Sequence, residues 1–82
     1  MYTLHFGDDF LDSFKKLDSP IQLQVKKKLE KFENGKVKIE PLHGELASKY
    51  KVRIGKYRII FKFLNEKEIK LLEVGLRDKI YK

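Results

Sequence analysis

The chain has 82 residues, of which 41% are hydrophobic and 12% aromatic, enough for one small domain with its own core and too few for a second. It contains no cysteine and only two, well-separated histidines, which excludes a disulfide framework and a thiolate metal site, and two histidines alone cannot complete a zinc site. The net charge is +7, and no apolar run approaches the ~20 residues of a membrane span, so a soluble, cytoplasmic protein without membrane contact is expected.

The chain begins with a pattern that predicts a short strand and a first helix. Residues 2–6 alternate apolar and polar side chains, which is typical of a strand with Tyr2, Leu4 and Phe6 facing inward. After Gly7, one helical stripe is formed by Phe10, Leu11, Phe14 and Leu17. Asp8 or Asp9 is expected to cap this helix.

A second helix is predicted from residue 19 onward. Ser19 is expected at the N-cap, Pro20 at the first helical position, and Gln22 in a capping box with Ser19. The apolar stripe of this helix is Ile21, Val25, Leu29 and Phe32. Asn34-Gly35 offers a left-handed C-terminal cap, so the two helices are expected to form an antiparallel hairpin.

The second half of the chain predicts three strands. Residues 36–48 show no clear period and are interpreted as a loop, whereas Tyr50 begins a period-two run whose turn is Gly55-Lys56, with glycine placed for type II′. A third run, from Ile69 to Leu76, follows a turn at residues 65–67. The fold class is therefore α+β in the order β-α-α-β-β-β, with a two-helix hairpin packed on one face of a mostly antiparallel four-stranded sheet, in one domain covering residues 1–82.

The positive charge is confined to the second half of the chain. Residues 1–48 carry eight basic and eight acidic side chains, whereas residues 49–82 carry 11 basic and four acidic ones. Six cations and no acid lie between residues 49 and 62, namely Lys49, Lys51, Arg53, Lys56, Arg58 and Lys62. Such a cluster attracts polyanions, so a nucleic acid is the first partner to consider.

The predicted hairpin register gathers these cations on one face. With the turn at Gly55-Lys56, Arg53 faces Arg58, and Lys51 lies on the same side of the sheet. Like charges placed opposite each other are destabilising, whereas a phosphodiester bound across them would turn repulsion into attraction. The alternative is a solvated face whose long side chains splay apart.

The last predicted strand adds further candidates. If Leu72, Val74 and Leu76 face inward, Glu73 and Arg77 lie on the cationic side, and Arg77 becomes another phosphate ligand. Tyr81 is either a stacking platform for an RNA base or a core residue.

These residues carry a resemblance to a known family. The motif Lys51-x-Arg53-x-Gly55-x-Tyr57-Arg58, followed by Val74-Gly75-x-Arg77 and Tyr81, resembles the RelE toxins of the RelE/ParE superfamily over essentially the whole chain. The resemblance implies a toxin of a type II toxin–antitoxin pair that cuts messenger RNA in the ribosomal A site and is held inactive by a small acidic, RelB-like antitoxin. No cofactor is expected. It also implies that the catalytic residues are Lys51, Arg53, Arg58, Arg77 and Tyr81.

RNA cleavage without a metal requires attack of a 2′-hydroxyl on the adjacent phosphorus. The hydroxyl needs a base, the phosphate oxygens need cations, and the leaving 5′-oxygen needs a proton donor. Lys51 is the expected base because like charges around it lower its proton affinity, and Arg58 is assigned to the transition state. Arg77 would assist at the leaving group and Arg53 would hold the backbone.

Other titratable residues have less specific assignments. Glu73 either takes the base role or pairs with Arg77, and His5 and His43 are expected to be surface residues without a catalytic role. The Lys26-Lys27-Lys28 run is either a solvated helix face or a contact with ribosomal RNA.

Two rival functions stay open at this stage. A ParE-like relative would share the fold and poison DNA gyrase without nuclease chemistry. A plain RNA- or ribosome-binding module would use the same cations without cutting.

Overall fold

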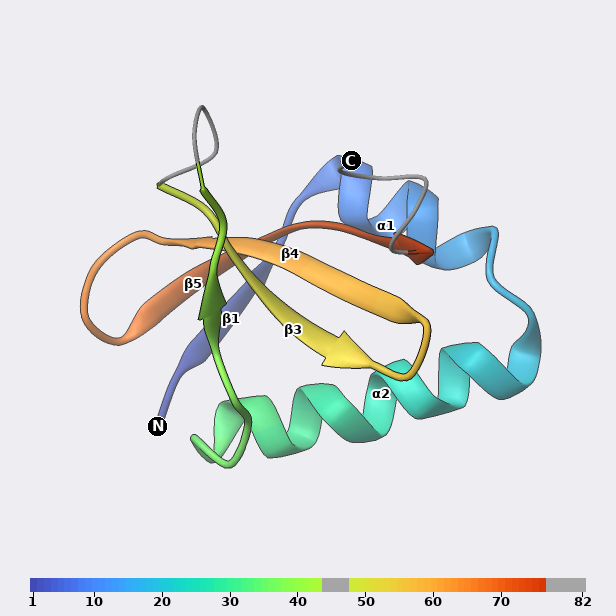
Figure 1. Ribbon diagram of the computed structural model, residues 1–82, viewed down its shortest axis with the longest axis horizontal. Helices are drawn as coiled ribbons and strands as arrows, with labels where there is room; N and C mark the ends of the chain where they lie inside the picture. The colour runs from blue at the N-terminus through green and yellow to red at the C-terminus, as the bar shows by residue number, and fades with distance from the viewer. Residues whose placement is uncertain (44–47, 77–82) are drawn as a thin grey trace.

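The computed structural model describes residues 1–43 and 48–76 as seven elements of secondary structure (Figure 1). In chain order they are β1 (Thr3–Phe6), α1 (Asp8–Lys15), α2 (Ser19–Glu33), β2 (Glu40–Pro41), β3 (Tyr50–Ile54), β4 (Tyr57–Phe63) and β5 (Glu68–Leu76). Among the described residues the sheet order is β1-β5-β4-β3-β2, in which only the β1/β5 pair is parallel. The expected α+β fold is confirmed, but the sheet has five strands and not four.

The additional strand lies in the segment for which the sequence predicts a loop. β2 is two residues long and pairs antiparallel with the first residues of β3. Pro41 lacks a backbone N–H, which restricts it to the edge of a sheet, and β2 is the edge strand here. Val37 and Ile39, which precede it, pack against the core, so an alternating pattern does run into this strand.

Both helix beginnings differ from the predicted caps. α1 starts at Asp8 with Gly7 at the N-cap, and α2 starts at Ser19 with Asp18 at the N-cap, and neither cap makes a side-chain hydrogen bond. Asp8 and Asp9 instead occupy the first turn of α1, where their charge favours the helix dipole. The predicted capping box is wrong, because the Gln22 side chain donates to the carbonyl oxygen of Phe14 at 3.0 Å.

The end of α2 follows the prediction closely. Gly35 has a φ of +71°, and its N–H donates to the carbonyl of Phe32 at 2.9 Å. The N–H of Lys36 donates to the carbonyl of Lys31 at 2.8 Å, which completes a Schellman motif.

The β3–β4 hairpin has the predicted turn and register. Gly55 has a φ of +57°, and no non-glycine residue in the described ranges has a positive φ, as a type II′ turn with glycine at its first central position requires. Arg53 lies directly opposite Arg58, and Lys51 lies opposite Ile60. Side chains of these four residues therefore share one face of the sheet.

A register shift in β5 changes the face of one predicted core residue. Ile60 of β4 lies opposite Glu73 and Phe61 lies opposite Leu71, so Leu72 is the extra residue of a β-bulge. Leu71 and Val74 are buried, whereas Leu72 is only partly buried. The prediction that Leu72 faces the core is wrong for this reason.

Two N-terminal elements cover successive halves of β5. β1 pairs with residues 68–71, and the chain then leaves the sheet as α1, which packs beside the second half of β5 (Figure 1). The N–H of Val74 donates to the hydroxyl oxygen of Ser13 at 3.0 Å, so a side chain of α1 replaces a strand as the acceptor.

The core lies between the two helices and one face of the sheet. In Figure 1, α2 runs beneath β3 and β4. Its predicted stripe is confirmed, with Val25, Leu29 and Phe32 buried and Ile21 packed against them. Phe32 meets Phe61 of β4 edge to face with ring centroids 4.8 Å apart. Phe6 and Leu11, also predicted inward, are 49% and 41% exposed.

Within residues 1–43 and 48–76, neither helix has the length and apolarity that crossing a membrane requires.

Candidate functional site

The sheet face opposite the helices, called here the outer face, carries the predicted basic residues. Arg53 of β3 and Arg58 of β4 form a directly opposed pair. Gly75 of β5 lies on the other side of Arg58 and presents no Cβ beside it. The pairing of like charges that the sequence indicated is therefore confirmed.

Arg58 is not a solvated surface residue. It is 8% exposed, and its Nε has no hydrogen-bond partner. Its neighbour Ile60 is fully buried but does not belong to the core cluster between helices and sheet, so the middle of the outer face is covered. A buried polar group without a partner costs free energy, and a guanidinium more than most. The splayed, solvated alternative is wrong for Arg58, although Arg53 keeps a side chain that is 49% exposed.

The outer face contains an acid that the sequence pattern did not reveal. Glu40 of β2 lies opposite Lys51, and its Oε2 is 3.1 Å from Nε of Arg53. The expectation of an arginine pair with no acid nearby is thus corrected, because β2 brings in Glu40 from outside the basic segment. The alternation of Val37, Ile39 and Pro41 was the sequence signal for this strand.

A second row on this face joins opposite charges around Lys51. β2, β3, β4 and β5 place Glu40, Lys51, Ile60 and Glu73 side by side in register. Lys51 is partly buried, as is Glu73, whose predicted position on the basic side is confirmed. Lys51 therefore shares its row with two carboxylates in addition to the nearby arginines, and carboxylates favour the charged form of an amine.

Arg77 and Tyr81 complete the predicted site and lie outside the described residues, which end at Leu76. β5 leads directly to Arg77, since Leu76 is the last residue of the strand and lies opposite Tyr57.

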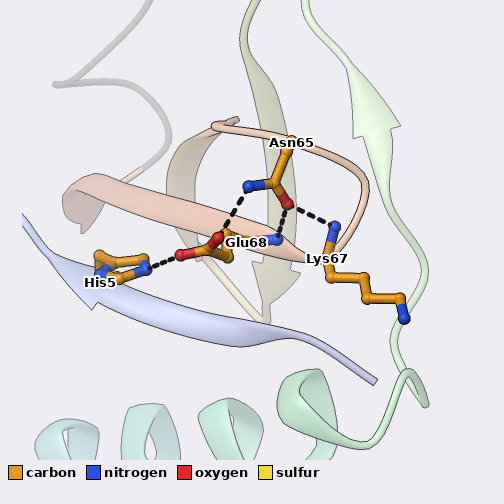
Figure 2. Close-up of polar contacts among 4 residues, drawn as sticks. All are labelled: His5, Asn65, Lys67 and Glu68. Carbon is orange, nitrogen blue, oxygen red and sulfur yellow. Dashed lines mark hydrogen bonds and ion pairs between the residues drawn. The ribbon is translucent and has the colours of Figure 1, made fainter.

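Neither histidine belongs to the group around Arg58. His43 is exposed, and His5 lies on β1, where its Nε2 is 2.8 Å from Oε1 of Glu68 (Figure 2). The Glu68 carboxylate also accepts a hydrogen bond of 2.7 Å from the Asn65 side chain. The bond from Asn65, followed by that with His5, holds the pKa of Glu68 below its ordinary value of 4.5. Both histidines are surface residues, as expected.

The part of the chain that the structure describes contains no group of three or more His, Cys, Asp or Glu side chains arranged to hold a metal ion. The outer face offers clustered cations with two carboxylates beside them, which suits the binding of a phosphate and the stabilisation of charge that develops on it.

Comparison with known proteins finds extensive similarity to toxins. A family model described as the ParE toxin of the type II toxin–antitoxin system parDE matches residues 4–81. The mRNA interferase toxin RelE of Escherichia coli (strain K12) is 32% identical over 81 residues, which cover 95% of this chain and 85% of that protein.

Solved structures agree with this similarity. A chain of the RelBE2 toxin–antitoxin complex from Mycobacterium tuberculosis superposes with a TM-score of 0.77 and 28% identity, over 93% of this chain and 98% of that one. The isolated E. coli RelE toxin gives a TM-score of 0.70 and 30% identity, over 93% and 84% of the two chains. The family match at residues 4–81 includes β3 and β4, the strands that carry the arginine pair.

Proposed function

The chain belongs to the RelE/ParE family of type II toxins, and from this premise we propose that it cleaves messenger RNA in the ribosomal A site. The observation that carries the proposal is the burial of Arg58, which is 8% exposed and whose Nε lacks a hydrogen-bond partner while Arg53 lies opposite. A protein that had only to fold would gain by replacing this arginine with an apolar side chain. A phosphate group bound at the arginine pair offsets the repulsion between the two guanidinium groups.

The proposed reaction uses no metal ion. The 2′-hydroxyl attacks the adjacent phosphorus, a 2′,3′-cyclic phosphate forms, and the 5′-oxygen leaves as a hydroxyl after gaining a proton. Arg58 stabilises the charge on the phosphate oxygens in the transition state, and Arg53 holds the backbone. Arg77 assists at the leaving group, and Tyr81 stacks on a base.

Two residues compete for the role of general base in this proposal. Lys51 serves if the arginines lower its proton affinity more than Glu40 raises it. Glu73, two strands away in the same row, is the other candidate, unless it pairs with Arg77. The ribosome would contribute by bending the messenger so that the 2′-hydroxyl, phosphorus and leaving oxygen align, which lets a weak base suffice.

The proposed partners follow from the relatives. The similar chain from M. tuberculosis belongs to the toxin–antitoxin complex RelBE2, so we expect a cognate, acidic antitoxin for this chain. Ribosome binding in the cytoplasm is expected to use the exposed lysines of α2, Lys26 and Lys27, as contacts with ribosomal RNA.

The decisive experiment is primer extension on messenger from a translation reaction to which the purified toxin is added. Wild-type protein should produce cuts at codon-defined positions, and Arg58→Ala should lower the cleavage rate by about 10²-fold or more, as expected when a transition-state cation is removed. Arg58→Gln removes the charge but retains most of the side-chain volume, so it separates the loss of the cation from an effect on packing. Both variants should keep the folded circular dichroism spectrum.

Two outcomes would contradict the proposal in different ways. Equal cutting by wild type and both variants would remove Arg58 from the mechanism. No cutting by wild type, with linear DNA accumulating when gyrase is present, would favour the ParE-like function that the description of the matching family suggests. Binding to ribosomes with no cut messenger would leave a non-catalytic module.

A further inference from the structure

A second group of cations crosses the outer face at a distance from the arginine pair. Lys62 of β4 lies directly opposite Lys70 of β5. Lys49, whose carbonyl accepts a hydrogen bond of 3.0 Å from the N–H of Leu42, comes immediately before β3 and continues this row beyond Lys62. We call these three residues the lysine row. Lys70 lies outside the motif that carries the family resemblance, and only the β4/β5 register brings it beside Lys62.

Within the lysine row, the ammonium groups of Lys62 and Lys70 repel each other. Lys62 and Lys70 are both exposed, and neither forms an ion pair with another described residue. Directly opposed like charges destabilise a sheet, as they do for Arg53 and Arg58. We propose that the lysine row binds a second phosphate of the RNA strand whose scissile phosphate lies at Arg58. The inference rests on the proposed function for its ligand, a single-stranded RNA.

The spacing along β4 makes the two phosphate sites distinct. Arg58 and Lys62 are four residues apart on one strand and point to the same face, which separates their Cα atoms by about 13 Å. This distance exceeds the size of a phosphate group, so side chains that extend straight out from the sheet at these two positions contact different phosphates of one strand. The bound RNA therefore runs along β4 across the outer face.

A hollow beside the lysine row offers room for a nucleoside. It has a volume of about 380 Å³ and is lined by Lys49, Lys70, Leu72, Glu73, Gly7, Asp8 and Asp9. The β-bulge in β5 is the reason that Leu72, an apolar side chain, lines this hollow. Leu72 provides an apolar contact for a base, and the carboxylates can accept hydrogen bonds from base amino groups. Because those carboxylates repel phosphate, the phosphate itself is assigned to Lys62 and Lys70.

The test is the salt dependence of binding to short oligonucleotides that cannot be cut. Fluorescence anisotropy would compare a 2′-deoxy hexanucleotide with a 2′-deoxy dinucleoside monophosphate, which has a single phosphate. The double variant Lys62→Gln/Lys70→Gln should bind the hexanucleotide several-fold more weakly. Its slope of log K against log[salt] should be smaller by about 0.7, the change expected when one phosphate of a single strand is no longer neutralised. Its binding of the dinucleoside monophosphate should be unchanged.

A matched control removes the same charge elsewhere. Lys31→Gln/Lys36→Gln neutralises two exposed lysines at the C-terminal end of α2, on the helix side of the molecule. It should leave the hexanucleotide slope unchanged. The inference is overturned if both double variants alter the slope equally, because the effect would then come from net charge, or if the lysine-row variant alters neither slope nor affinity.

The outcome of the salt-dependence experiment can be distinguished from the outcome of the cleavage experiment. A reduced slope for Lys62→Gln/Lys70→Gln supports the lysine row even if wild-type protein cuts no messenger on ribosomes, in which case the proposed nuclease function fails alone. An unchanged slope together with codon-defined cutting by wild type refutes the lysine row and leaves the nuclease intact.

Discussion

Arg58 and Arg53 share one site but occupy different environments. Arg58 is buried, with an unpaired Nε, whereas Arg53 is half exposed and contacts Glu40 at 3.1 Å. A phosphate that approaches this pair thus finds one guanidinium that forms no ion pair with a described residue and one that already has a carboxylate. Glu40 reduces the repulsion between the arginines in the free protein and competes with the phosphate for Arg53.

This competition makes a prediction for Glu40→Gln. The variant should bind the 2′-deoxy hexanucleotide more tightly than wild type at low salt, because Arg53 no longer has a competing carboxylate. Its free energy of unfolding should fall by about 0.2–1 kcal/mol, the usual value of a partly exposed ion pair. Anisotropy measures the first effect and urea denaturation the second.

A matched control for Glu40→Gln is available on the helix side. Glu30→Gln removes one negative charge from an exposed position on α2, so it reports the effect of net charge alone. Equal tightening of RNA binding by the two variants would mean that Glu40 acts through net charge and not through Arg53.

At the scale of elements, β5 is the strand on which the site and the fold depend together. Its first half pairs with β1, its second half is covered by α1, and the bulge at Leu72 lies where one partner gives way to the other. Gly7 allows this change, since a Cβ there would lie 2.7 Å from the carbonyl oxygen of Leu71, a distance that real Cβ atoms do not tolerate. The N–H of Gly7 donates to that same oxygen at 3.0 Å.

Ser13 secures the second half of β5, and its removal should destabilise the fold. Ser13→Ala leaves the N–H of Val74, a residue that is 1% exposed, without its acceptor. An unsatisfied buried donor costs about 1–3 kcal/mol, so the urea midpoint should fall accordingly. Ser19→Ala, at the exposed first position of α2, is the control and should change the midpoint little. Similar midpoints for both variants would show that the bond to Val74 contributes no stability.

Over the whole molecule, the features that depend on residues close in sequence were predicted better than those that depend on tertiary contacts. Gly55 marks the turn because glycine readily adopts the positive φ that the turn needs. The position of the turn then determines which residues of β3 and β4 lie opposite each other, including Arg53 and Arg58. The α2 stripe and the Gly35 cap were also predictable, because each depends on neighbours within one or two helical turns.

The N-caps of both helices were local errors, and three further errors arose where distant segments decide the structure. Leu72 fits an inward pattern by itself, and only its pairing with β4 creates the bulge that moves it. β2 is two residues long and exists because β3 offers an edge, so the alternation of Val37, Ile39 and Pro41 was not recognised as a strand and Glu40 was missed with it. The burial of Arg58 likewise depends on tertiary structure that a basic, alternating strand does not reveal.

The first and last described strands are joined by a contact that should make stability depend on pH. His5 and Glu68 are 63 residues apart in the chain, and the Asn65 side chain holds the same carboxylate while its Oδ1 accepts the N–H groups of Lys67 and Glu68 (Figure 2). The pKa of Glu68 is lowered in the folded chain, first by the bond from Asn65 and then by that with His5. The carboxylate therefore stabilises the fold above its ordinary pKa of 4.5, and this contribution is lost as the pH falls through the lowered pKa.

Glu68→Gln tests this linkage. At pH 7 the variant should unfold at a lower urea concentration than wild type, and the difference should shrink below pH 4.5 and vanish once the carboxyl group is protonated in both states. Glu66→Gln, in the same turn and without a side-chain bond to any described residue, should show no such convergence. A difference between wild type and Glu68→Gln that stays constant from pH 7 to pH 3 would mean that the side chain acts through shape or neutral hydrogen bonds, since only an ionised carboxylate makes its contribution depend on protons.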